Sequence, residues 1–355
     1  MNHPRHRLFA LALAVASLGL ATAPTSAATH QVRARTATTQ GVIVWTQRTA
    51  DGSSQHLMIS RADGSHQREL TPAIPDSGDI DAQISPNGRW IAYEHDTPDG
   101  DTIRLVRPSG ARDHLVDVGC VDPCGGVDAP TWLSNDRLAF LRVIGPLDAN
   151  GNAVSAVLHT SHLNGGHVRR LSERGIDGVY EDRYARISRD RSYITFQRLR
   201  LADSANALFR MAPNGSHVRQ LTPWELNADL YDLSTARRGP TKDLIVFQSV
   251  GRGDPDQTFI DTGFVPATCA SLTDCTSKIV WMTDNGATGR RTSNPQWSPN
   301  GSSLVFTDRS SINEPNAEIW TMKFGGSEPS RRNISNSLNF DFRPAWGRQA
   351  DGHRR

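Results

Sequence analysis

The sequence is poor in lysine, in long apolar runs and in catalytic signatures. Its only lysines are Lys242, Lys278 and Lys323, and none of them follows a glycine, which excludes a P-loop. The chain holds no H-E-x-x-H, no G-x-S-x-G and no G-x-G-x-x-G opening a helix. Beyond the first 28 residues, no stretch reaches the roughly 20 apolar residues that span a bilayer. We therefore expect no integral membrane segment, no catalytic residue, no metal and no cofactor.

The chain also lacks an excess of either charge. It holds 39 Lys and Arg against 37 Asp and Glu. Arg5 and Arg7 lie in the first 28 residues, where no acidic residue occurs, which leaves 37 basic and 37 acidic side chains in the rest. A nucleic-acid-binding protein needs a basic surface to displace counterions from phosphates. We therefore expect no nucleic-acid partner.

Residues 1–28 have the pattern of a cleaved secretory signal. A basic start, MNHPRHR, precedes an apolar run of about 13 residues from Leu8 to Leu20, too short for a bilayer span. Small residues, Thr25 to Ala28, suit a signal peptidase, and no cysteine follows that could carry a lipid anchor. We expect a flexible segment over 29–40 and a soluble protein that is secreted, periplasmic or in the cell envelope.

The four cysteines fall into two close pairs, Cys120 with Cys124 and Cys269 with Cys275. Four cysteines allow three pairings, and local pairing is the prediction for an exported protein. Each bridge would close a small loop and contribute about 2 kcal/mol. A shared four-cysteine zinc site is the alternative, although such sites usually have C-x2-C to C-x4-C spacing.

A short apolar phrase recurs along the chain. Each copy has two small or apolar residues followed by an aromatic one, and β-branched and aromatic residues of this kind favour strands. The copies are Ile43-Val44-Trp45, Ile91-Ala92-Tyr93, Leu138-Ala139-Phe140, Ile194-Thr195-Phe196, Ile245-Val246-Phe247 and Leu304-Val305-Phe306. They are 48, 47, 56, 51 and 59 residues apart.

Turn signals complete each repeat. A second strand follows each phrase and leads to a dipeptide that tolerates positive φ, as two-residue hairpin turns require. These dipeptides are Asp63-Gly64, Ser109-Gly110, Asn164-Gly165, Asn214-Gly215, Asn285-Gly286 and Gly325-Gly326. A short last strand follows each turn. Each unit of roughly 50 residues is therefore predicted to be a four-stranded antiparallel meander.

Tandem meanders without helical periodicity predict an all-β fold, a six-bladed β-propeller over 41–347. The first repeat begins with its second strand near Val42, and the chain ends on a lone first strand from Asp341 to Gly347. We expect this C-terminal strand to join blade 1 and close the ring, so that no long sheet edge is exposed. Residues 348–355 are expected to form a disordered tail.

The stretches NPQWSPNGSSLVF (294–306), IWTMKFGG (319–326) and RRNIS (331–335) resemble the WD40-like repeat of TolB-type periplasmic propellers. The resemblance covers about 41 to 347. It implies a cell-envelope role with a peptidoglycan-associated lipoprotein as partner. We expect the chain to lack the α/β domain that precedes the propeller in TolB. Similar repeats occur in prolyl-oligopeptidase-type enzymes, whose hydrolase domain and G-x-S-x-G elbow are not found here.

Charged residues gather where each innermost strand is predicted to begin. Because innermost strands line a propeller's channel, we expect a binding site at the channel mouth formed by Asp81, Asp128, Asp182, Arg183, Asp229, Asp341 and Arg343. Asp79 and Glu181 belong to the same clusters. The alternative is that these carboxylates bond turn backbone and have no functional role.

Two loops exceed the repeat plan, 143–156 and 250–277, and long loops on rigid scaffolds often bind partners. The second could instead be a flap that packs on its own blade. Residues 148–152 start like a calcium loop, but Ala153 stands where its glycine should be and no glutamate follows in place, so a plain turn is favoured. His66, His167 and His217 recur two residues after a turn glycine and are expected to be structural, as are His159 and His162.

Two functions fit these observations. The first is an exported, non-enzymatic propeller, monomeric, that binds or scaffolds a protein or peptide over the channel mouth or the 250–277 loop. The second is an extracellular polysaccharide lyase or hydrolase with its site in the channel, which would need several channel residues to converge as acid, base and charge stabiliser.

Overall fold

The computed structural model describes residues 41–350 apart from 146–154, 174–175, 255, 257–258, 287–288, 311–315 and 326–329. Within these residues the protein is all-β, with one short helix, α1 (Leu272–Ser277), and two 3-10 turns, η1 (Trp224–Leu226) and η2 (Gly251–Gly253). No helix in the described part is long and apolar enough to cross a membrane. The expected signal at 1–28, the segment at 29–40 and most of the expected tail lie outside these residues.

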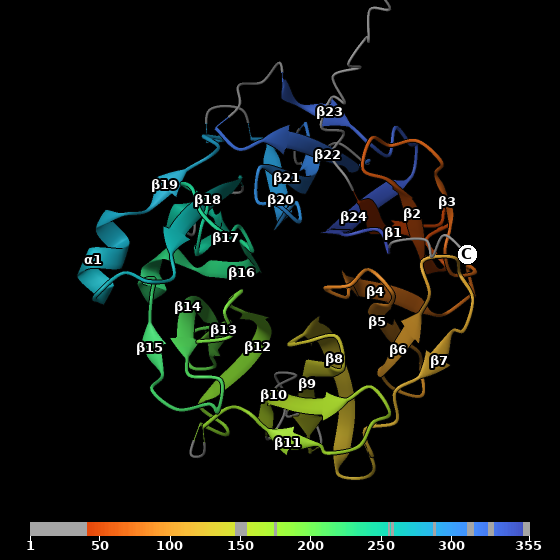
Figure 1. Cartoon of the computed structure of the whole chain (residues 1–355), viewed down its shortest axis with the longest axis horizontal. Helices are drawn as coiled ribbons and strands as arrows, with labels where there is room; N and C mark the ends of the chain where they lie inside the picture. The colour runs from red at the N-terminus through yellow and green to blue at the C-terminus, as the bar shows by residue number, and fades with distance from the viewer. Residues whose placement is uncertain are drawn as a thin grey trace, which may run out of the picture. The chain divides into compact units, whose positions relative to one another are not determined.

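The strands pair into antiparallel meanders, each named here after its innermost strand (Figure 1). The β24 meander comprises β24 (Phe340–Gly347), β1 (Val42–Arg48), β2 (Gln55–Arg61) and β3 (Arg68–Glu69). The β4 meander comprises β4 (Gly78–Ile84), β5 (Ile91–Asp96), β6 (Thr102–Val106) and β7 (His114–Leu115). The β8 meander comprises β8 (Cys124–Trp132), β9 (Arg137–Ile144), β10 (Ser155–His162) and β11 (Arg169–Arg170).

The later half of the chain repeats this plan. The β12 meander comprises β12 (Tyr180–Ile187), β13 (Ile194–Arg200), β14 (Ala205–Met211) and β15 (Arg219–Gln220). The β16 meander comprises β16 (Ala228–Leu233), β17 (Leu244–Val250), β18 (Ile260–Pro266) and β19 (Val280–Trp281). The β20 meander comprises β20 (Arg291–Trp297), β21 (Ser303–Arg309), β22 (Glu318–Lys323) and β23 (Arg332–Asn333). The predicted four-stranded antiparallel repeat is therefore confirmed.

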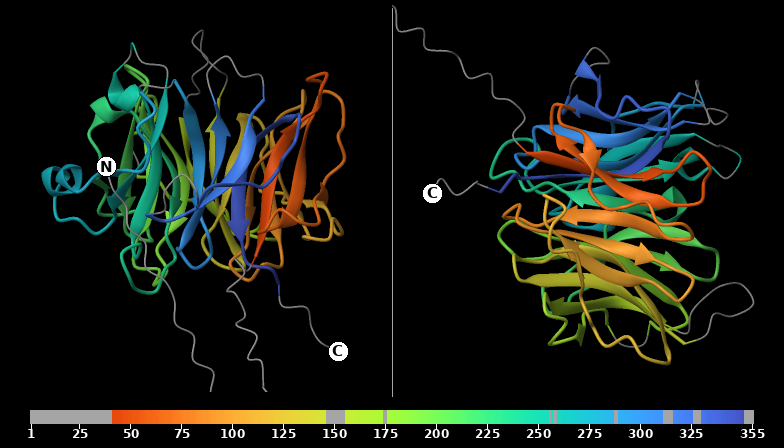
Figure 2. Two further views of the ribbon diagram at one scale, coloured as in Figure 1. Left: turned by 90° about the horizontal axis from the view of Figure 1, so that it is seen from above. Right: turned by 90° about the vertical axis from the view of Figure 1, so that its right-hand side faces the viewer.

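The two ends of the described chain meet in one meander. The last strand, β24, pairs antiparallel with β1, from Val42 opposite Gly347 to Arg48 opposite Phe340. The innermost strands also contact one another in succession, β4 with β8, β8 with β12, β12 with β16, β16 with β20, β20 with β24 and β24 with β4. Figure 1 shows them facing a common centre, and Figure 2 shows the strands running between two sides that carry the connecting loops.

The recurring aromatic phrase forms the core between neighbouring meanders. Its aromatic side chains, Trp45, Tyr93, Phe140, Phe196, Phe247 and Phe306, are among the largest side chains that are completely buried. Phe306 shares a cluster with Trp297 of its own meander and with Val246 and Phe264 of the β16 meander. Because a sheet buries its apolar faces only against another layer, the repeat stabilises each meander through its neighbours.

The β16 meander differs from the sequence prediction. Residues Ile260–Pro266, expected to lie in a long loop, form the third strand, and Phe264 and Val265 are buried in the core. Val280–Trp281 is the fourth strand, so Asn285-Gly286 follows this meander instead of turning its hairpin. The connection between β18 and β19 contains α1 and a disulfide. Because it is longer than a two-residue hairpin turn, the sequence pattern did not reveal it as the turn between the third and fourth strands. The prediction that 250–277 is one long loop is therefore wrong for residues 260–266.

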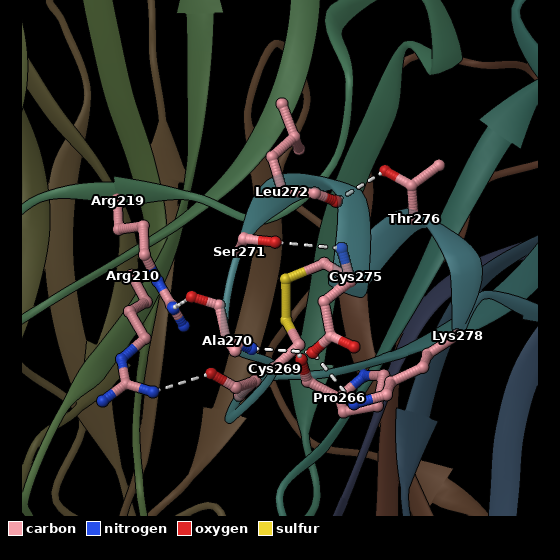
Figure 3. Close-up of a disulfide and its surroundings, with 12 residues drawn as sticks. Arg210, Arg219, Pro266, Cys269, Ala270, Ser271, Leu272, Cys275, Thr276 and Lys278 are labelled. Atoms are coloured by element: carbon pink, nitrogen blue, oxygen red, sulfur yellow. Dashed lines mark hydrogen bonds and ion pairs between the residues drawn. A yellow bond between two sulfur atoms is a disulfide. The ribbon is translucent and has the colours of Figure 1, made fainter.

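Both predicted disulfides are present, Cys120–Cys124 and Cys269–Cys275. Figure 3 shows the second one beneath α1, where the Cys275 N–H donates to the Ser271 carbonyl over 2.8 Å. Arg219 of β15 donates to the Ala270 carbonyl over 2.7 Å. The connection from β18 to β19 is thus fastened to the β12 meander as well as to its own.

We expect a Cys269→Ala/Cys275→Ala variant to lose about 2 kcal/mol of unfolding free energy, since the bridge closes a short loop. The cysteines are six residues apart in sequence. Urea unfolding followed by tryptophan fluorescence measures the loss, with a Cys120→Ala/Cys124→Ala variant as the matched comparison. Complete unfolding in buffer would show that the bridge holds the whole fold together and contradict this expectation.

Candidate functional site

Each innermost strand has a register shift near its middle, where a bulge redirects a side chain. In β4, β8, β12, β16 and β20 the shifts occur between residues 80 and 83, 128 and 131, 183 and 186, 230 and 232, and 293 and 296. In β24 the shift occurs between Phe342 and Ala345. Residues at these bulges line one central cavity: Asp81, Ala129, Tyr184, Tyr231, Asn294 and Arg343. Pro130, Pro295 and Pro344 follow three of them, which is understandable because a bulge needs no ladder hydrogen bond at that position.

The central cavity is small. Its volume open to water-sized molecules is about 20 Å³, enough for a single water. Arg343 Nη1 lies 3.2 Å from Asp81 Oδ2, and the rings of Tyr184 and Tyr231 stack with centroids 6.4 Å apart. Arg186 Nε lies 3.4 Å from Asp232 Oδ1. These side chains fill the space between the strands at this level.

The two tyrosines are not poised as bases. The negative charge of Asp81, together with burial, raises the pKa of Tyr184 well above its usual value. Burial and then the charge of Asp229 raise the pKa of Tyr231. Both phenols therefore stay neutral at physiological pH, and they can donate hydrogen bonds but cannot readily remove a proton.

The structure brings only two of the predicted mouth residues, Asp81 and Arg343, into the central cavity. Asp182 is completely buried, and both of its oxygens accept from Arg198, over 2.6 and 2.9 Å. Asp341 is completely buried as well and accepts from Gln47 Nε2 over 2.8 Å. These two carboxylates are not available to a partner at the surface. Arg183 pairs with Glu181 on its own strand.

Asp229 has a bridging position. Its two oxygens accept from Gln197 Nε2 and from Gln248 Nε2, each over 3.1 Å. Burial raises the pKa of Asp229 to about 6, although both amides and the charge of Arg183 oppose the shift. The carboxylate therefore joins β13 to β16 and β17, which is a structural role in the assembly of the meanders.

The cross-meander glutamines belong to a pattern that sequence reasoning missed. Gln197 Oε1 accepts from the Leu230 N–H, and Gln248 Oε1 accepts from the Asn294 N–H, each over 3.1 Å. Glu94 Oε2 accepts from the Ala129 N–H over 2.9 Å in the same way. Each acceptor directly follows the aromatic of the repeat and reaches the next innermost strand near its bulge. A polar residue at this position of a buried strand was the available signal.

Asp128, another predicted mouth residue, lies in an acidic cluster on the side where the innermost strands begin. Burial raises the pKa of Asp128 from 3.8 to about 7; the charge of Arg183 opposes this shift, and the charge of Asp81 adds to it. Burial, and then the charges of Asp128 and Asp81, raise the pKa of Glu94 well above its usual value. Both carboxyls therefore keep their protons to a higher pH than exposed carboxyls do.

The recurring histidines share one local conformation. His66, His167 and His217 have φ values of 59°, 56° and 57°, so they recur because they form the same turn. The His159 ring stacks on Phe140. His95, which had not been singled out, bonds Asp79 through Nδ1 over 2.6 Å. The loop that holds Asp148 to Asn152 lies outside the described residues.

Comparison with known proteins identifies the fold. No family model matches the chain, and no curated protein matches it significantly. Among solved structures, TolB from Acinetobacter baumannii superposes with a TM-score of 0.63 at 16% sequence identity, over 87% of this chain and 67% of that one. This protein has a TolB-like β-propeller fold. The meanders are thus propeller blades.

Two other solved structures with a similar fold belong to proteins with different names and roles. Hydrazine synthase from Kuenenia stuttgartiensis superposes with a TM-score of 0.61 at 10% identity, over 87% of this chain and 47% of that one. A chain of the nidogen/laminin complex superposes with a TM-score of 0.54 at 10% identity, over 87% of this chain and 99% of that one. At such identities the likeness concerns the fold alone, so the function must be argued from the residues.

Proposed function

We propose that this protein is an exported, non-enzymatic propeller that binds a protein or peptide partner on one side of its disc. Six blades would form a ring closed by β24, and the pairing of β24 with β1 and the succession of contacts among the innermost strands support this closure. A closed ring removes exposed sheet edges and makes a rigid platform for loops. The two disulfides and the signal-like residues 1–28 support export.

Exposed apolar side chains on the loops that lead into the innermost strands carry this proposal. Ile74 precedes β4, Val121 precedes β8, Val179 precedes β12 and Leu338 precedes β24. Their exposed fractions are 48%, 73%, 49% and 89%. Because each loop ends at the start of an innermost strand, all four lie on one side, which we call the lead-in face. Recurrent exposed apolar groups near charged ones are typical of protein-binding surfaces.

The enzyme alternative receives less support from the geometry. A polysaccharide needs an open cleft with an acid and a base in reach of the scissile bond. The central cavity has room for about one water, and its tyrosines are held neutral. No histidine is among the described residues that line it. Binding on the lead-in face requires only the exposed apolar side chains and no widening of the central cavity.

Surface variants test the proposed function. The purified protein and an Ile74→Ser/Val121→Ser/Val179→Ser/Leu338→Ser variant would be used as baits for envelope and secreted proteins of the source organism. Each captured protein is identified, purified and titrated by calorimetry. We expect an identified partner to bind the variant at least about 10-fold more weakly, since one of the four residues at the centre of the interface is enough to cost more than about 1 kcal/mol.

A Leu115→Ser/Leu272→Ser/Val280→Ser variant is the matched control, because these exposed apolar residues lie on outer strands or on α1. It should bind the partner as the parent does. The proposal would be overturned if the partner bound the lead-in variant as tightly as the parent protein. It would also be overturned if neither bait captured a specific partner. The resemblance to TolB makes a peptidoglycan-associated lipoprotein one partner to include.

A further inference from the structure

Three carboxylates converge at the end of β5 and the start of β6. Glu94, Asp96 and Asp101 each offer an oxygen, and these oxygens all lie within 4.8 Å of one another. Glu94 is buried, and the other two are half-buried. Among the described residues, no arginine or lysine forms an ion pair with any of the three. Such crowding is unfavourable unless protons or a cation compensate for it.

A pocket of about 270 Å³ opens beside this group, between the β1–β2 loop and the starts of β4 and the β5–β6 loop. Asp96 and Ser54 both line it. Ser54 is only 3% exposed, and its Oγ has no hydrogen-bond partner among the described residues. Asp96 Oδ1 is equally hidden from solvent, and only a protonated Glu94 or Asp101 carboxyl could donate a hydrogen bond to Asp96. Buried oxygens of this kind are normally satisfied, so two of them in one pocket point to a missing ligand.

A glycine, Gly78, forms part of the pocket wall. Gly78 pairs with Asp96 on one side and with Gln55 on the other, so it lies between them. A Cβ at Gly78 would meet only Asp96 and Gln55 side-chain atoms, at 3.6 to 3.8 Å. Gly78 and Asp96 thus line the pocket side by side, and a side chain at Gly78 would contact the Asp96 carboxylate.

The chemistry of the donors selects the ligand. Carboxylate and hydroxyl oxygens, with no nitrogen or sulfur, suit a hard cation. Calcium takes 6–8 oxygen ligands at about 2.3–2.6 Å in irregular geometry, so two ligands of one ion lie at most about 5 Å apart. The spacing of the three carboxylate oxygens is within this limit. Magnesium demands a near-ideal octahedron and keeps its waters, so it fits less well.

We propose that Glu94, Asp96 and Asp101 bind one calcium ion, which enters through the pocket that Ser54 and Gly78 line. The pocket leaves room for the water ligands that complete the coordination, and the Ser54 hydroxyl bonds one of them. Mutual repulsion contributes to the raised pKa values of Glu94 and Asp101, where burial is the largest cause. A bound dication would offset that repulsion and fasten the β5–β6 loop. This site does not depend on the proposed partner.

Thermal unfolding and calorimetry of the EGTA-treated protein test the site. Millimolar CaCl2 should raise the melting temperature by about 5–10 °C, whereas NaCl of equal ionic strength should not and MgCl2 should do so less. The rise should disappear in Asp96→Asn and shrink in Ser54→Ala. Asp99→Asn is the matched control, since Asp99 is an exposed carboxylate on the same loop outside the group, and it should keep the full rise.

The metal-free melting temperatures separate lost binding from lost folding. Asp96→Asn removes one of several like charges, so without calcium it should melt at the same temperature as the parent or higher. The absence of a calcium-dependent shift in the parent protein would overturn the proposal and mean that the pocket holds only water. An equal shift in Asp96→Asn would overturn it as well.

Discussion

An Asp182→Ala variant should unfold with a free energy about 3 kcal/mol lower than that of the parent protein, because a buried arginine loses two charged hydrogen bonds and keeps only the one to Glu173. Arg198 is 5% exposed, and its Nε and Nη2 donate to the two Asp182 oxygens over 2.6 and 2.9 Å. The guanidinium also lies over the rings of Tyr180, Phe196 and Phe209. It cannot turn to solvent without leaving this packing. Urea denaturation measures the loss.

Asp203→Ala is the matched control for this experiment. Asp203 accepts two hydrogen bonds from Arg200, which is two residues from Arg198 on β13, so the chemistry of the pair is the same. This pair is exposed, however, and water replaces it at little cost. Stability should be almost unchanged. If Asp182→Ala changed stability as little as Asp203→Ala, the buried ion pair would contribute little to stability, contrary to this prediction.

Raising the pH from about 5 to about 8 should destabilise the protein through Asp128, by roughly 2–3 kcal/mol. The folded state raises the pKa of Asp128 from 3.8 to about 7, mainly by burial. A carboxyl with a raised pKa binds its proton more tightly in the folded state. The free energy of unfolding therefore falls as the pH rises from near 4 to near 7. His159, whose pKa burial lowers, acts in the opposite direction below about pH 6.5.

Comparing Asp128→Asn with the parent isolates this term. When both are measured in EGTA, the variant should be more stable than the parent at both pH values, with an advantage about 2–3 kcal/mol larger at pH 8 than at pH 5. The groups that act on Asp128 include Asp81, Asp96 and Asp101, which raise its pKa, and Arg183, which lowers it; Glu94 interacts with it as well. Asp203→Asn again serves as the control and should leave the pH dependence intact. Parallel stability curves for Asp128→Asn and the parent would contradict the expectation.

The candidate site was only partly predictable from the sequence. The positions of Asp81 and Arg343 followed from the start of the innermost strands, and both line the cavity. Asp182 and Asp341 lie two residues before the bulge positions Tyr184 and Arg343, and they are buried opposite Arg198 and Gln47. The difference is therefore the position of each residue relative to the bulge. Strand register decides that pairing, and a one-residue shift reverses the face on which a side chain lies.

The repeat, by contrast, could be predicted from the sequence. The aromatic phrase, the turn dipeptides and the two close cysteine pairs are local signals, because strand propensity, turn conformation and short-loop closure depend on adjacent residues. They predicted the four-stranded antiparallel meanders and both disulfides. The same locality explains the error in the β16 meander, where an inserted helix moved the turn away from Asn285-Gly286.

The sequence by itself determined the architecture of each unit, the all-β class and the pairing of the cysteines. Only the tertiary structure decided which residues from distant units meet. The bulges that bring Asp81, Tyr184 and Arg343 to one cavity, the pocket between Ser54 and Asp96, and the convergence of exposed apolar loops on one face all depend on how units pack around a common centre. That packing is set by interlocking surfaces far apart in the chain, and no local pattern encodes it.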